Sequence, residues 1–178
     1  MAVPGQLGHP EISQSLDQER IKSLAAWCGQ TLSSARPVPF AAEIIHTTTG
    51  KRLMRARNAV APLKDPSAHA ELRTVRLACR RKGSFSLSGY TLYSTCEPCP
   101  MCMANALWAG LDRVVYGATI ADANRFCRQI QIPAAEVAQR SDMSATAVVG
   151  PVCREECLAL FTDPRMQEAF RTWSSAKP

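Results

Sequence analysis

The sequence predicts an α/β fold with three layers, α/β/α, in which a five-stranded mixed sheet lies between helices. Helical and strand-like segments alternate along the chain, and this alternation is typical of a sheet covered on both faces. Five segments have strand character, and the first two are joined by a short turn as a hairpin. The length of 178 residues, with 46% hydrophobic and 20% charged residues, fits one globular domain.

The first third of the chain predicts one long helix and then the hairpin. Residues 1–10 contain several prolines and glycines and are expected to form a loose lead-in. Apolar residues at helical spacing predict a helix from Glu11 to Ser34, which the prolines of the segment Arg36–Pro39 end. The hairpin follows as a strand, a turn and a strand, at Ala41–His46, Thr47–Lys51 and Leu53–Ala56.

The rest of the chain alternates helices with strands. Pro66 and Ser67 predict a helix that begins near Ala68 and ends at Lys82-Gly83, and a second helix begins near Pro98 and ends at Gly110. Residues 122–139 are expected to be partly helical, with a break at Pro133. The remaining strands are Tyr90–Thr95, Arg113–Tyr116 and Thr146–Val149, and the remaining helices are Pro151–Phe161 and Pro164–Ser174. We therefore expect a lead-in at 1–10, one main domain at 11–162, and a C-terminal helix and tail at 163–178.

Composition also bears on location and class. It excludes a disordered, collagen-like or coiled-coil chain, and no apolar run approaches the ~20 residues of a membrane span. The first ten residues have neither the basic nor the apolar region of a secretory signal. The eight cysteines are therefore expected to be reduced thiols in a cytoplasmic protein, without disulfides.

Positive charge is concentrated in one part of the chain. The net charge is +6, and residues 51–82 contain ten lysines and arginines against Asp65 and Glu71. Such a stripe is either a phosphate-binding surface or a solvated face. We favour the solvated face, because no aromatic residue accompanies these charges before Phe85.

Two short motifs predict a metal site. His69-Ala70-Glu71 and Cys99-Pro100-Met101-Cys102 each stand at the start of a predicted helix, where aligned N–H groups favour thiolates. His69, Cys99 and Cys102 form a nitrogen and sulfur ligand set that suits one zinc ion per chain. Three protein ligands leave a position for water, which is typical of catalytic zinc. Glu71 lies two residues from His69, so it is the candidate general acid and base.

These motifs resemble those of the cytidine and deoxycytidylate deaminase superfamily, whose zinc signature is known. The similarity covers about residues 24–150, and its remaining parts are Pro39–Ala42, Arg57–Val60, Leu92–Glu97 and Val114–Ala118. The resemblance implies hydrolytic removal of an exocyclic amine, with ammonia released and Glu71 moving the protons. It also implies that Asn58 binds the base, that Phe40 and Trp108 line its faces, and that the backbone of Ala70 or Cys99 contacts the substrate.

Within the superfamily, Cys96–Cys102 followed by Trp108-Ala109 is most similar to the guanine deaminase branch. A small-molecule nucleobase or nucleoside with a guanine-type or related ring is therefore the expected substrate, and a homodimer the expected assembly. This chain has Asn124–Arg128 where that branch usually has Gly-Phe-Asp-Asp. Two alternatives stay open. One is a tRNA adenosine deaminase, in which the basic stripe would bind nucleic acid, and the other is a non-catalytic, zinc-stabilised interaction module.

Overall fold

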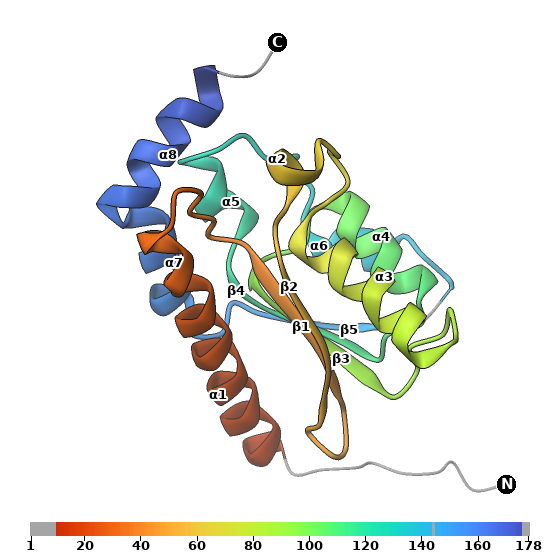
Figure 1. Cartoon of the computed structure of the whole chain (residues 1–178). Helices are drawn as coiled ribbons and strands as arrows, with labels where there is room; N and C mark the ends of the chain where they lie inside the picture. The colour runs from red at the N-terminus through yellow and green to blue at the C-terminus, as the bar shows by residue number, and fades with distance from the viewer. Residues whose placement is uncertain (1–9, 144, 176–178) are drawn as a thin grey trace, which may run out of the picture.

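The sheet and its two helical layers confirm the predicted fold class. The computed structural model describes residues 10–143 and 145–175. All but the last residue of the expected lead-in, and the end of the tail, therefore lie outside the described residues. Figure 1 shows the sheet between two groups of helices, with α1, α7 and α8 on one side and α3, α4 and α6 on the other.

The sheet has five strands in the order β2-β1-β3-β4-β5. Strand β1 pairs antiparallel with β2 and with β3, whereas β4 pairs parallel with β3 and with β5. The sheet is therefore mixed, as predicted. The strands match the expected segments within one or two residues at each end, and they are β1 Ala41–His46, β2 Arg52–Arg57, β3 Tyr90–Cys96, β4 Arg113–Ala118 and β5 Ala147–Val149.

The helices form the outer layers. One face of the sheet is covered by α1 and α7, with α8 packed on α7, and the other face by α3, α4 and α6. Their bounds are α1 Pro10–Gly29, the short 3₁₀ helix η1 Gln30–Ser33, α2 Val60–Leu63, α3 Ala70–Lys82, α4 Pro100–Trp108, α5 Ile120–Asn124, α6 Ala134–Gln139, α7 Arg154–Thr162 and α8 Pro164–Ser175.

Three local differences from the expectations have physical causes. The helices α3 and α4 begin two residues later than expected, because His69 and Cys99 are extended N-cap residues. The side chain of Asp65 accepts hydrogen bonds from the N–H and hydroxyl of Ser67, which closes a turn ahead of α3. The short helix α2 is not expected from the sequence, and it begins where Asn58 Oδ1 accepts the N–H of Val60 at 3.0 Å.

Each face of the sheet has its own apolar core. Ile21, Leu24, Tyr93 and Phe161 are buried under α1 and α7, and Val75 belongs to the core beneath α3 and α4. The α7 layer lies unusually close to the sheet at Gly117, where an added Cβ would come within 2.2 Å of Cys157 Sγ. Glycine is therefore required at this position for steric reasons.

A buried ionic cluster fixes α1 to the sheet. Asp17, which is 3% exposed, accepts the hydroxyl of Tyr93 at 2.7 Å and two hydrogen bonds from Arg113 at 3.2 and 2.7 Å. Bidentate pairing of this kind compensates for the desolvation of both charges. The cluster joins the first helix to the central strand β3 and its neighbour β4.

We expect Arg113→Leu to lower the free energy of unfolding by about 3 kcal/mol, because it leaves the Asp17 carboxylate buried without its cation. Urea denaturation followed by circular dichroism measures this loss. The matched control is Arg140→Ala, which breaks the exposed pair with Glu136 and should cost no more than about 1 kcal/mol. Equal losses in the two variants would show that the cluster contributes little.

Candidate active site

The structure brings the three predicted metal ligands together. The ligand atoms of His69, Cys99 and Cys102 all lie within 4.8 Å of one another, and Cys99 Sγ is 3.7 Å from His69 Nδ1. His69 and Cys99 hold the N-cap positions of α3 and α4, and neither side chain caps its own helix. Both side chains are thus available at the point where the two helices begin.

The donor set fits a zinc ion. Bond lengths of about 2.0–2.1 Å to nitrogen and 2.3 Å to sulfur require ligand atoms separated by somewhat less than 4 Å in a tetrahedron. The hydrogen bond with Cys102, and then that with His69, lower the pKa of the Cys99 thiol, whereas the neighbouring Cys99 and burial raise the pKa of Cys102. Two such close sulfurs become thiolates together only beside a cation, which a metal ion supplies.

Glu71 lies beside this cluster on the first turn of α3. Glu71 is only 5% exposed, and this burial raises the pKa of its carboxyl to about 7. A carboxyl that titrates near neutral pH both accepts and returns a proton readily. The electrostatic environment therefore suits the predicted role of Glu71.

A cleft of about 1320 Å³ opens over the cluster. Its inner lining includes His69, Glu71 and Cys99 together with the predicted substrate-binding residues Phe40 and Asn58. The rest of the wall comes from four segments: the stretch from η1 to β1, α2, residues 127–129 and one side of α8.

The local contacts of Asn58 fix the direction of its amide group. Its Oδ1 accepts the N–H of Val60, and its backbone N–H donates to the carbonyl of Phe40 at 3.0 Å. Because Oδ1 is engaged, the NH₂ group is the part of this cleft-lining side chain that keeps donors for a ligand. Phe40 is held from behind by an edge-to-face contact with Phe161, at 5.3 Å between ring centres.

The side chains of Trp108 and Ala70 are not part of the cleft lining. Trp108 does not line the cleft of its own chain but stands 70% exposed on the outer side of α4, beside a smaller hollow near Val75 and Phe85. The methyl group of Ala70 is completely buried in the core, so only the backbone of Ala70 is left to contact a substrate. Trp108 thus lies outside the lining of the cleft, and its contact with the base stays a prediction.

Sequence reasoning missed Glu97, which directly precedes Pro98 and Cys99. Its carboxylate is buried and accepts the N–H groups of Ile120 at 3.0 Å and Ala134 at 2.9 Å, at the first residues of α5 and α6. Both helices are thereby tied to the strand end that carries the metal ligands. Nothing in the local sequence indicates these partners, which lie more than twenty residues away.

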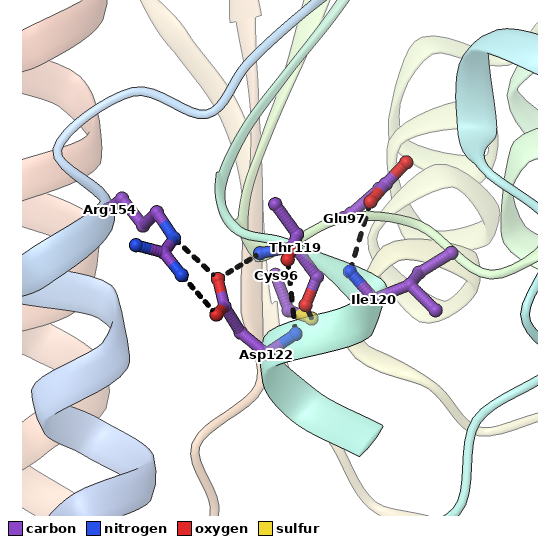
Figure 2. A network of polar contacts seen from close by, with 6 residues as sticks. All are labelled: Cys96, Glu97, Thr119, Ile120, Asp122 and Arg154. Carbon is purple, nitrogen blue, oxygen red and sulfur yellow. Dashed lines mark hydrogen bonds and ion pairs between the residues drawn. The ribbon is translucent and has the colours of Figure 1, made fainter. Parts of the chain in front are cut away.

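Figure 2 shows how the start of α5 is fixed beside Glu97. Thr119 and Asp122 form a capping box, and Arg154 of α7 donates to both carboxylate oxygens of Asp122. The hydrogen bond from Arg154 is the main reason that the pKa of Asp122 is lowered to about 2. This network holds in place the segment that leads from β4 into the cleft wall.

Comparison with known proteins agrees with this geometry. The family model described as the cytidine and deoxycytidylate deaminase zinc-binding region matches residues 17–118, more than half of the chain. The chain is 40% identical over 85 residues to guanine deaminase of Bacillus subtilis, which covers 48% of this chain and 53% of that protein. It is also 40% identical over 81 residues to a tRNA-specific adenosine deaminase of Aquifex aeolicus, which covers 46% and 52% respectively. The chain thus matches about half the length of these curated relatives.

A solved structure supports the fold over a longer stretch. The guanine deaminase of Nitrosomonas europaea superposes with a TM-score of 0.66 and 22% identity, covering 95% of this chain and 88% of the other. The family match and the position of the three ligands confirm the predicted zinc cofactor. In residues 10–143 and 145–175, no helix is long and apolar enough to cross a membrane.

We expect Cys102→Ala to lose most of its zinc, because two remaining protein ligands hold the ion weakly. Elemental analysis after dialysis gives the zinc content per chain. Cys79→Ala is the matched control, since Cys79 lies further along α3, outside the ligand cluster, and should retain one zinc per chain. Full zinc content in Cys102→Ala would require a different ligand set.

Proposed function

The chain belongs to the cytidine and deoxycytidylate deaminase family, whose members are zinc-dependent deaminases, and we propose that its substrate is a small-molecule nucleobase or nucleoside. The ring is guanine-type or related, and hydrolysis replaces its exocyclic amine by a carbonyl oxygen and releases ammonia. The observation that carries the proposal is the buried carboxyl of Glu71, which shares one cleft with His69 and Cys99.

The residues have separate roles in this reaction. His69, Cys99 and Cys102 would hold the zinc ion, which would supply an activated water with a pKa of about 7. Glu71 accepts one proton from the water and delivers it to the ring nitrogen next to the reacting carbon. It then moves the second proton to the amine, which leaves as ammonia. A pKa near neutral suits Glu71 to both directions of transfer.

Binding of the ring is assigned to Asn58 and Phe40. The free NH₂ of Asn58 can donate to a carbonyl oxygen or an unprotonated ring nitrogen of the base. Phe40 offers an aromatic surface in the inner part of the cleft. The proposal includes a homodimer and a cytoplasmic location, which rest on the resemblance and on the use of cysteine in the sequence.

A tRNA adenosine deaminase is the second candidate. The relative from Aquifex aeolicus supports it at the same identity as the guanine deaminase, and α3 carries part of the basic stripe. The structure divides that stripe. Arg73 donates to the carbonyl of Arg57 within the fold, whereas Arg76 and Arg80 are exposed on the surface. Arg76 also makes an exposed ion pair with Asp65 at 3.9 Å, so an RNA phosphate would have to compete with that carboxylate.

We expect Glu71→Gln to keep about one zinc per chain and to lose at least ~10² in kcat, the usual contribution of general acid and base catalysis. Ammonia release from guanine, guanosine, adenine, adenosine, cytosine and cytidine identifies the ring and measures the loss. Glu136→Gln, at an exposed carboxyl on α6, is the control and should keep full activity. Near-normal turnover by Glu71→Gln would remove Glu71 from the mechanism.

The second candidate is tested with the double variant Arg76→Ala/Arg80→Ala. Binding of tRNA through these residues predicts weaker affinity and a shallower log–log salt slope. The slope should fall by ~0.9 for each duplex phosphate that the variant no longer neutralises, or by ~0.7 for single strands. We expect instead that kcat/KM for the small-molecule substrate is unchanged and that tRNA is not deaminated. Deamination confined to tRNA, and abolished in the double variant, would make the second candidate the function.

A further inference from the structure

One carboxylate holds both ends of a segment that forms part of the cleft wall. Glu97 accepts the N–H of Ile120 through Oε2 at 3.0 Å and the N–H of Ala134 through Oε1 at 2.9 Å. These N–H groups belong to the first residues of α5 and α6, so the chain leaves this carboxylate at one N–H group and returns to it at the other. The stretch between them, residues 120–134, is called the wall segment below, because its middle at 127–129 lines the cleft.

The position of Glu97 is itself tied to the metal ligands. It lies two residues before Cys99, and Pro98 between them restricts the backbone on both sides. The backbone N–H of Glu97 donates to the carbonyl of Ala118 at 2.7 Å, which fixes it to the end of β4. Figure 2 shows its side chain beside the N–H of Ile120, at the start of α5. The side chain of Glu97 thus places the wall segment relative to the metal site.

Contacts inside the wall segment carry this placement to the cleft. Asn124 Oδ1 accepts the N–H of Gln129 at 3.0 Å, and Gln129 Nε2 donates to the carbonyl of Cys127 at 3.3 Å. Phe126 packs on Phe161 of α7, with 6.0 Å between the ring centres. The middle of the wall segment is therefore an internally bonded unit, and its place over the cleft depends on where its two ends are fixed.

A carboxylate suits this position better than any other side chain of the same size. Each oxygen of Glu97 accepts one N–H group, and Glu97 is only 8% exposed. An amide of the same shape has one acceptor oxygen and one NH₂ donor, so one of the two backbone N–H groups would face a donor. A buried N–H without an acceptor is costly, and that end of the wall segment would move until it reaches water.

We propose, on the basis of the function proposed above, that Glu97 is a positioning residue for substrate binding. It keeps the wall segment at a fixed place beside the metal ligands, so that residues 127–129 contact the bound ring or the groups attached to it. Both carboxylate oxygens are engaged, so proton transfer stays with Glu71. A change that weakens the binding of substrate and transition state alike raises KM and leaves kcat unchanged, and this is the effect we assign to the loss of Glu97.

Steady-state kinetics of Glu97→Gln test this, with whichever of guanine, guanosine, adenine, adenosine, cytosine and cytidine wild type deaminates fastest. We expect KM to rise ~10-fold, the value of one charge-assisted hydrogen bond, while kcat and the zinc content stay nearly unchanged. Limited digestion with trypsin gives a second readout. Arg125 and Arg128 are exposed in the wall segment, and both should be cleaved faster in the variant.

The matched control is Asp17→Asn, which also replaces a buried carboxylate by its amide. Asp17 belongs to the cluster with Tyr93 and Arg113, outside the cleft lining, so this variant should lose stability without a change in KM or in cleavage of the wall segment. Asn124→Ala is a second test variant at an exposed position, and it leaves the apolar cores intact. It releases the N–H of Gln129 and should raise KM by a smaller factor.

Three results would overturn the proposal. A decrease in kcat at unchanged KM in Glu97→Gln would place Glu97 in the chemical step, and loss of zinc would make it a support of the metal ligands. Unchanged kinetics and cleavage in Glu97→Gln, or equal changes in Asp17→Asn, would show that the wall segment does not depend on Glu97. If Glu97→Gln does not fold, Asn124→Ala decides, and an unchanged KM in that variant is the contrary result.

The same measurements separate this proposal from the proposed function. If wild type releases ammonia and neither variant changes KM, the positioning role is wrong and the deaminase stands. If wild type releases ammonia from none of these compounds, the proposed function fails. Faster cleavage at Arg125 and Arg128 in Glu97→Gln, with full zinc content, then still supports the hold of Glu97 on the wall segment, and unchanged cleavage overturns it.

Discussion

The convergence of two helix N-termini is the constraint on which the rest of the molecule depends. His69 and Cys99 precede α3 and α4, and a metal holds them only if both helices begin at the same point on one face of the sheet. The order β2-β1-β3 places the strands that lead into these helices two positions apart, so both helices pack side by side. Any shift of strand register would separate the ligands.

The same convergence creates the conditions for acid and base chemistry. Two helices direct their positive ends toward the thiolates, which stabilises the charged form of the sulfurs. Glu71 is forced into a buried position by its place on the first turn of α3, and burial is the main cause of its raised pKa. Glu97 connects further elements to this site, because its carboxylate holds the first residues of α5 and α6 at the end of β3.

The sequence was sufficient to predict whatever depends on local spacing. The fold class, the five strands and the grouping of His69, Cys99 and Cys102 follow from short patterns, and the structure agrees with them. Helix geometry explains why Trp108 points away from the metal ligands. It lies six residues after Cys102, and at 3.6 residues per turn that spacing places the two side chains on different faces of α4. The partners of Glu97 depend on tertiary packing, for which no local pattern exists.

Some residues of the cleft wall lie inside the part of the chain that matches the family model, and others lie beyond it. The family match ends at residue 118, and it includes the metal ligands, Glu71, Asn58 and Phe40. The outer wall also uses residues 127–129 and α8, which lie beyond that match. Relatives can therefore share the residues of the metal site while differing in the residues that form the rest of the cleft wall.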